Sequence, residues 1–189
     1  MWHLLGDSFL NNGFALQDLR AQAGLSISMT QDGVGGTSIT QQAARFAADP
    51  ASWNRLLIIN DGGFDGTAEE AIAAIDGIRS NLTHDYWLYM EPMIHAEVII
   101  GHANRAATEA KHQAMALALG DRFVPCQAAL IAAAISDPED PGYEQDQIDA
   151  ANGVYPASCR NDNSHPSLKG IAVRNTQVLA RMQALGWLT

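Results

Sequence analysis

Ser8 is the first residue of the chain whose type and position could do chemistry. It closes the triplet Gly6-Asp7-Ser8, which follows a short apolar run over residues 2–5. The run predicts a β-strand, and a serine just beyond the carboxyl end of such a strand lies where open α/β sheets bind their ligands. The alternative interpretation is an ordinary turn that Asp7 stabilises, because all three residue types are common in turns.

Asp162 and His165 form a second candidate, near the other end of the chain and directly before Pro166. On one turn that leads into a helix, the carboxylate could lie beside the imidazole and fix its tautomer. The other ring nitrogen could then accept the proton of a serine hydroxyl, which would activate a nucleophile. The simpler interpretation makes Asp162 a helix N-cap or a turn residue and His165 a solvated residue of the first helical turn.

These residues can meet only if the fold brings both ends of the chain to one sheet edge. Besides residues 2–5, we expect strands at residues 25–30, 56–59, 86–90 and 122–124, and helices at residues 11–23, 38–48, 67–82, 104–119, 127–135 and 165–185. Alternating strands and helices are typical of an α/β protein, a three-layer α/β/α sandwich with a parallel sheet. The length of 189 residues predicts a single domain over residues 1–189, in which residues 137–158, acidic and containing Pro and Gly, form a surface excursion beside the active face.

Four segments would then converge at the carboxyl edge of the sheet. They are the Ser8 turn, a glycine loop at Gly35-Gly36, residues 60–65, and residues 162–165. Each motif is weak by itself, but their order along the chain makes the joint pattern much more specific.

This ordered pattern resembles the SGNH hydrolases, also called GDSL esterases and lipases. Residues 4–8 are similar to the first sequence block of that family, with Ser8 in the position of the nucleophile. Residues 162–166 are similar to its fifth block, which gives Asp162 and His165 the remaining roles of a catalytic triad. The resemblance extends from Leu4 to about Leu179 and implies a flavodoxin-like fold with five parallel strands in the order 2-1-3-4-5.

The resemblance also implies an oxyanion hole, the set of donors that stabilises the negative charge of the reacting carbonyl oxygen. Residues 34–37 are similar to the second block, so the backbone N–H groups of Ser8 and Gly36 are the expected donors. The third block of the family is usually Gly-x-Asn-Asp, and its Asn supplies another donor. Asn60, followed by Asp61, is the candidate here, although the preceding glycine is missing; aligning on the glycine instead selects residues 62–65 and places Phe at the Asn position.

Composition excludes several other classes of function. The chain has 21 acidic and 11 basic residues, for a net charge of −10, which argues against a nucleic acid or an anionic membrane as partner.

No apolar run reaches the length of a membrane-spanning helix. The first strand and its polar turn do not resemble a signal peptide, so the sequence as written fits a cytoplasmic protein unless a leader has been removed. The compartment therefore stays open, and the sequence does not indicate the oligomeric state. Cys126 and Cys159 are compatible with one disulfide or with two separate thiols.

The resemblance therefore implies a serine esterase that hydrolyses a small-molecule ester through an acyl-enzyme and needs no metal or organic cofactor. The short chain, with no long apolar lid, favours short acyl groups such as acetyl, on a carbohydrate for example. The altered third block leaves an alternative, a catalytically weak protein of the same fold that binds a glycan or a protein.

Overall fold

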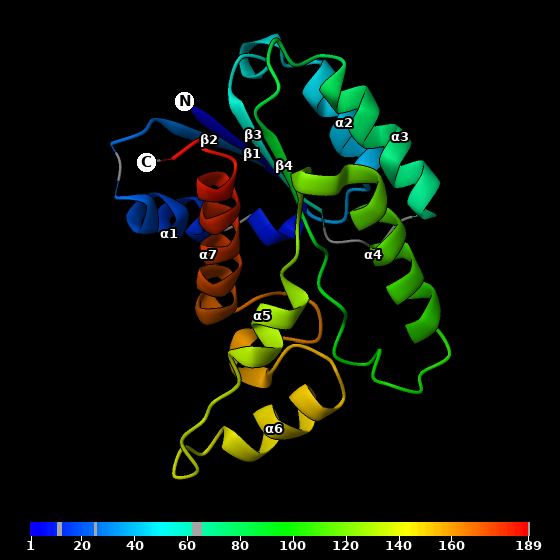
Figure 1. Ribbon diagram of the computed structural model, residues 1–189, viewed down its shortest axis with the longest axis vertical. Coiled ribbons are helices and arrows are strands. Elements are labelled where there is room, and N and C mark those ends of the chain that lie inside the picture. The colour runs from blue at the N-terminus through cyan, green and yellow to red at the C-terminus, as the bar shows by residue number, and fades with distance from the viewer. Residues whose placement is uncertain (11–12, 25, 62–65, 189) are drawn as a thin grey trace.

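The computed structural model describes residues 1–10, 13–24, 26–61 and 66–188 (Figure 1). Its centre is a sheet of five parallel strands in the order β2-β1-β3-β4-β5. The strands are β1 (Trp2–Gly6), β2 (Met29–Gly33), β3 (Leu56–Asn60), β4 (Trp87–Met90) and β5 (Phe123–Val124). The predicted fold class and strand order are confirmed.

Helices cover both faces of the sheet and produce the three predicted layers (Figure 1). The helices are α1 (Phe14–Ala23), α2 (Ile39–Ala47), α3 (Ala68–Arg79), α4 (Arg105–Leu119), α5 (Gln127–Ala132), α6 (Tyr143–Ala151) and α7 (Leu168–Ala184). Successive strand residues point to opposite faces. Leu4 and Ile58 accordingly pack with α1 and α7, whereas Leu5, Leu57 and Ile59 pack with α2, α3 and α4. Among the described residues, none of the helices is both long and apolar enough to cross a lipid bilayer.

The second strand differs from its prediction. It occupies Met29–Gly33 rather than residues 25–30, of which Leu25 lies outside the described residues. Pairing with β1 sets these bounds, because the ladder runs from Trp2 opposite Met29 to Gly6 opposite Gly33. As an edge strand, β2 is only half-buried along its length and carries polar residues, so its apolar pattern does not mark its true extent.

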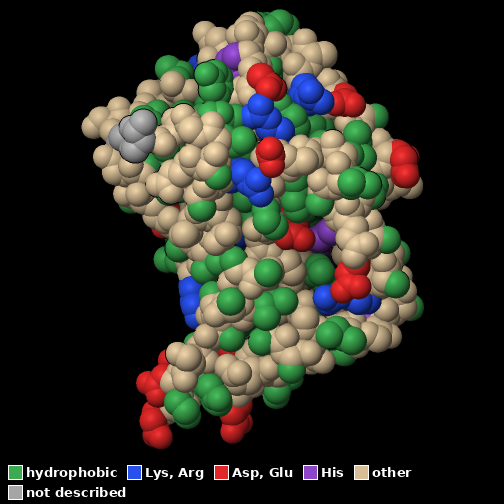
Figure 2. Space-filling view, in the orientation of Figure 1, with side chains coloured by type: hydrophobic (Ala, Val, Ile, Leu, Met, Phe, Trp, Pro, Cys, Tyr) green, Lys and Arg blue, Asp and Glu red, His purple; other side chains and the backbone are tan. Residues whose placement is uncertain are grey.

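Two helices also depart from expectation. The predicted surface excursion at residues 137–158 contains α6, held by the fully buried Asp146, whose carboxylate accepts hydrogen bonds from the backbone N–H groups of Ile135 and Ser158. Acidic side chains gather at the outer end of this region, where Asp137, Glu139 and Asp140 are exposed (Figure 2). The last helix begins at Leu168 rather than at residue 165, because the Ser167 hydroxyl caps it. His165 therefore lies in the turn before α7.

The two cysteines are buried, free thiols. Cys126 and Cys159 both belong to the core between the sheet and α7, and neither forms a disulfide. Burial raises the pKa of the Cys126 thiol to about 11, so this thiol stays protonated and packs as a small apolar side chain.

Candidate active site

The turn that carries Ser8 begins where β1 and β3 approach each other closely. A Cβ on Gly6 would lie 2.5 Å from the carbonyl oxygen of Asn60, so no larger residue fits at this position. After Gly6, the Asp7 carboxylate accepts a hydrogen bond from the backbone N–H of Phe9 at 3.0 Å. Ser8 then opens one short 3₁₀ turn, Ser8–Leu10. Asp7 thus stabilises the turn, as expected from the sequence, and the chain leaves the sheet edge at Ser8.

Ser8, His165 and Asp162 are brought together at this edge. The Ser8 Oγ atom lies 2.9 Å from His165 Nε2, across 157 positions of sequence. The opposite ring nitrogen, Nδ1, lies 2.8 Å from Asp162 Oδ2. This network is consistent with a proton on Nδ1 that is donated to the carboxylate, which leaves Nε2 free to accept the serine hydroxyl.

The Asp162 carboxylate has two tasks in the same turn. Its Oδ1 atom accepts hydrogen bonds from the backbone N–H groups of Ser164 and His165, both at 2.8 Å, while Oδ2 faces the imidazole. These backbone donors are the main reason that the pKa of Asp162 is well below its ordinary value. The side chain is 55% exposed, so hydrogen bonds rather than an enclosed site keep it ionised. The turn interpretation and the triad interpretation of Asp162 are therefore compatible.

Two neighbours fix the His165 ring and its turn. The Phe9 ring meets the imidazole edge-on, with ring centroids 5.7 Å apart and an interplanar angle of 74°. The loop after β4 donates a hydrogen bond from the Ala96 N–H to the Asn163 carbonyl at 3.0 Å. The turn before α7 is thus supported from β1 on one side and from the β4–α4 loop on the other.

The expected oxyanion donors lie at the carboxyl ends of β1 and β2. Within the described residues, the backbone N–H groups of Ser8 and Gly36 donate no hydrogen bond, so both remain available to a ligand. Gly36 has a φ of 70°, which favours glycine, and a Cβ there would meet nothing within 4 Å. The Thr37 hydroxyl donates to the Val34 carbonyl and stabilises this turn.

Asn60, the third expected donor, is the last residue of β3 and pairs with Gly6 of β1. Its side chain is buried, and its Oδ1 atom has no hydrogen-bond partner among the described residues. The competing alignment at residues 62–65, with Phe64 in the Asn position, lies outside the described residues. Asn60 is therefore next to the nucleophile turn, and its role as a donor stays a prediction.

Sequence reasoning missed a group of buried charges behind the nucleophile turn. Asp7 and Asp61 are 2% and 3% exposed, and Arg174 of α7 is 2% exposed. The Tyr89 hydroxyl donates to Asp61 Oδ2 at 3.1 Å. The pKa of Asp7 is raised to about 6, chiefly by burial and also by the charge of Asp61, while the Phe9 N–H and Arg174 oppose this shift. A helical pattern could have revealed Arg174, because it occupies a core-facing position three residues after Ile171.

We expect Asp7→Asn to stabilise the protein increasingly as the pH rises. The pKa of Asp7 is raised from 3.8 to about 6 on folding, so folding favours the protonated carboxyl, and stability falls between these two values as the pH rises. An amide has no such cost and its oxygen can still accept from Phe9. The gain should be small near pH 4 and approach roughly 3 kcal/mol above about pH 7. Urea unfolding of both proteins at pH 4.5 and pH 8 measures it; an equal difference at the two pH values would contradict the buried titration.

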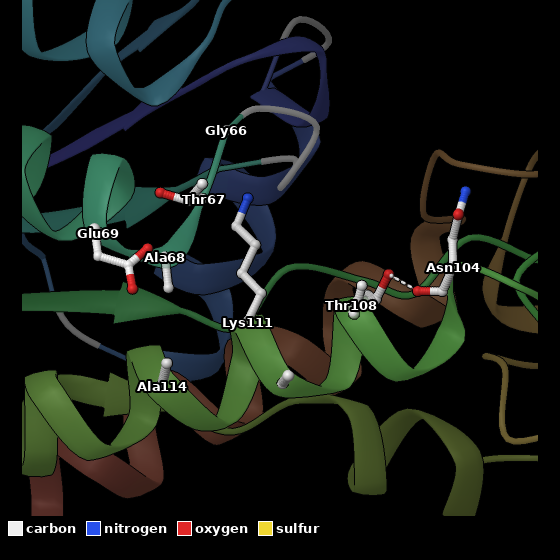
Figure 3. Close-up of a pocket in the computed structure, with 10 residues that line it drawn as sticks. Gly66, Thr67, Ala68, Glu69, Asn104, Thr108, Lys111 and Ala114 are labelled. Carbon is white, nitrogen blue, oxygen red and sulfur yellow. Dashed lines mark hydrogen bonds between the residues drawn. The ribbon is translucent and has the colours of Figure 1, made fainter.

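A small cavity opens beside the three residues. It has a volume of about 210 Å³ and its lining includes Ser8, His165, Phe9, Pro166 and Ile171. A larger cavity of about 660 Å³ lies between the start of α3 and the exposed side of α4 (Figure 3). Thr67, Glu69, Thr108 and Lys111 are among its lining residues, and Lys111 extends from α4 toward the start of α3. Because none of the three candidate residues lines the larger cavity, the small one is the candidate site for chemistry.

The strand order and a serine after β1 are the arrangement of the SGNH hydrolases, and comparisons of solved structures bear out this fold. An acetyl xylan esterase matches with a TM-score of 0.67 at 12% identity, covering 94% of this chain and 97% of the other. A GDSL-like lipase from Bacteroides thetaiotaomicron matches with a TM-score of 0.63 at 16% identity, covering 96% and 87%. The catalytic domain of a peptidoglycan O-acetyltransferase from Streptococcus pneumoniae matches with a TM-score of 0.56 at 15% identity, covering 99% and 94%.

The chain therefore has the SGNH hydrolase fold, which matches the acetyl xylan esterase and the GDSL-like lipase over 94% and 96% of its length. This is the fold that the sequence resemblance implied. No family model matches the sequence, and no curated protein matches it either.

Proposed function

We propose that this protein is a serine esterase of the SGNH type, which hydrolyses carboxylic esters through an acyl-enzyme. The observation that carries the proposal is the hydrogen-bonded series from Ser8 Oγ through the His165 ring to the Asp162 carboxylate. A nucleophile, a base and a group that orients the base are the parts that covalent acyl transfer requires.

Each residue has one role in the proposed reaction. His165 Nε2 accepts the Ser8 proton while Oγ attacks the carbonyl carbon of the ester. Asp162 holds the ring in place and stabilises the imidazolium that forms. His165 then protonates the leaving alcohol, and the acyl group remains on Ser8. A water molecule, deprotonated by His165, attacks this acyl-enzyme. The bond between the acyl carbon and Ser8 Oγ then breaks, His165 returns the proton to Oγ, and the acid is released. These steps use no metal or organic cofactor.

The negative charge of the tetrahedral intermediate needs fixed donors. The N–H groups of Ser8 and Gly36 are unpaired within the described residues, which supports their assignment as oxyanion donors. The side-chain amide of Asn60 would add a third donor from β3. Because a single donor contributes about 10²–10³ in rate, two backbone donors without Asn60 would give a slower enzyme rather than an inactive one.

Hydrolysis of p-nitrophenyl acetate tests the proposal directly. We expect the purified protein to hydrolyse this ester well above the spontaneous rate and the Ser8→Ala variant to match that spontaneous rate. Background rates for both proteins on a panel of acyl esters would instead support the alternative function, a glycan- or protein-binding module. The aligned triad favours the enzyme over that alternative.

The acyl group is proposed to be short, and acetyl is the best fit. The cavity beside Ser8 has a volume of about 210 Å³, and Phe9, Pro166 and Ile171 line it; this small volume favours a short acyl group. Two of the structures with this fold are described as an acetyl xylan esterase and a peptidoglycan O-acetyltransferase, and both names join an acetyl group to a polysaccharide. Acetylated carbohydrates are therefore the proposed substrate class.

A series of p-nitrophenyl esters measures the size of the acyl site. We expect kcat/KM to fall from acetate to octanoate by at least about tenfold, because each surplus methylene must displace packed side chains or remain in water. The alcohol part of the substrate is tested by measuring acetate release from an acetylated polysaccharide. The same polysaccharide after chemical deacetylation is the matched control and should release none. A preference for octanoate over acetate would contradict the short-chain assignment.

A further inference from the structure

Arg174 is a buried cation whose position calls for an explanation. It lies on α7 with an exposure of 2%, and its Nη2 atom donates to the Glu91 carbonyl at 3.2 Å. Its Nε atom has no hydrogen-bond partner among the described residues. Burying a guanidinium group is unfavourable unless neighbouring groups compensate it. A hydrocarbon side chain of similar length would occupy this core position at lower cost, so the contacts of the charged group must account for its presence.

The guanidinium lies against the candidate catalytic residues through one aromatic ring. Its Cζ atom is 5.5 Å from the centroid of the Phe9 ring, which is the geometry of a cation–π contact. Phe9 directly follows Ser8 in the chain, and its ring meets the His165 imidazole edge-on at 5.7 Å. Phe9 thus lies against both Arg174 and the candidate base, His165.

We propose that Arg174 is a positioning residue: it fixes the Phe9 ring and thereby holds His165 and Ser8 at hydrogen-bonding distance. The inference rests on the proposed esterase function of the same site. A planar guanidinium can stack on an aromatic face and donate to the Glu91 carbonyl at the same time. Because Phe9 is adjacent to Ser8 in sequence and contacts His165 across 156 positions, a shift of its ring would separate the base from the nucleophile.

The competing role for Arg174 is to compensate buried negative charge. Asp7 is buried, and the charge of Arg174 lowers its pKa. A residue that served only this purpose would act on stability through Asp7, and its effect on the reaction would disappear when Asp7 is made neutral. A second substitution therefore distinguishes the two roles. The loss caused by removing Arg174 depends on Phe9 if Arg174 is a positioning residue, and on Asp7 if it only compensates charge.

Arg174→Met is the first test, with p-nitrophenyl acetate as substrate. We expect kcat to fall by about 10- to 100-fold with KM changed less than about threefold, because small displacements of reacting groups affect the chemical step. Arg174→Lys keeps a cation against the ring and should recover part of kcat. Arg55→Met is the matched control, since Arg55 bonds Thr30 and Ser52 at the opposite edge of the sheet. A wild-type kcat in the folded Arg174→Met protein would overturn the proposal.

A double-mutant cycle with Phe9→Leu tests the route of the effect. If Arg174 acts through Phe9, the double variant loses no more kcat than the more damaged of the two single variants. Losses that multiply would show that Arg174 acts independently of Phe9 and would overturn the proposal. Recovery of kcat when Asp7→Asn is added to Arg174→Met would also overturn it, in favour of charge compensation.

A readout without substrate separates this inference from the proposed function. In protein with ¹⁵N-labelled histidine, the His165 Nε2 resonance reports its hydrogen bond to Ser8, and the Ser8→Ala variant supplies the reference without this bond. We expect Arg174→Met to move the resonance toward that reference. An unchanged resonance would overturn the positioning role. If the wild-type protein hydrolyses no ester, the esterase proposal fails while this measurement still tests Arg174.

Discussion

Ser8→Ala should lower kcat for p-nitrophenyl acetate by at least about 10⁴-fold, because loss of a serine nucleophile from a complete triad has cost about 10⁶-fold elsewhere. The substitution removes the only oxygen that lies 2.9 Å from His165 Nε2 among the described residues, so no covalent intermediate can form at this position. The Ser8 N–H remains, and the backbone turn is held by Asp7 and Phe9 rather than by the hydroxyl. The variant should therefore fold normally.

A matched serine and a covalent probe complete this experiment. Ser80→Ala removes an exposed hydroxyl that donates to the Gly77 carbonyl at the end of α3, and we expect it to leave kcat unchanged. A fluorophosphonate should transfer its phosphonyl group, with loss of fluoride, to the wild-type protein and to Ser80→Ala but not to Ser8→Ala, and the added mass is measured. Labelling that persists in Ser8→Ala, or activity that survives in it, would show that another residue is the nucleophile.

Much of the fold follows from the sequence because its signals are local. The buried strands β1, β3 and β4 are short apolar runs between polar turns, and the helices between them carry a helical period. β2 was predicted too early because, at the sheet edge, its bounds are set by pairing with β1 rather than by apolar content. α6 was missed because a buried carboxylate, Asp146, and not an apolar face, ties it to its neighbours.

The residues of the candidate site likewise form two groups, those that the sequence could identify and those that it could not. Ser8, Asp162 and His165 could be named from the sequence because the turns that carry them have distinctive residue types and spacing. Arg174 and Phe9 could not be connected to them, because their contact depends on how α7 packs against the Ser8–Leu10 turn. An arginine on a core-facing helical position indicates a special environment, but the helical period does not reveal which group it meets. Asn60 could be named from the sequence, and the structure defines its position beside Gly6. Its function as an oxyanion donor stays a prediction.

Asp162→Asn should lower kcat by about 10²–10³-fold, less than the roughly 10⁴-fold loss known for a fully buried triad carboxylate. The smaller effect is expected because the Asp162 side chain is 55% exposed, so water screens its charge. The amide oxygen of Asn can still accept from the backbone N–H groups of Ser164 and His165, which preserves the turn. The amide nitrogen would then face His165 Nδ1 as a donor and favour a proton on Nε2. In that tautomer the imidazole cannot accept the Ser8 proton.

A second carboxylate with the same local geometry distinguishes this charge effect from loss of a turn. Asp137 likewise accepts a hydrogen bond from a backbone N–H two residues on, that of Glu139, in an exposed turn before α6, and it does not line the cavity beside Ser8. Asp137→Asn should leave kcat unchanged. Both variants should remain folded, with Asp162→Asn the less stable of the two at neutral pH, because it loses an ionised carboxylate whose pKa is lowered on folding. If kcat at pH 8 is within twofold of wild type in both, Asp162 only shapes its turn and another group must orient His165. A large loss in Asp162→Asn alone, with KM unchanged, is the result expected of a carboxylate that holds the base.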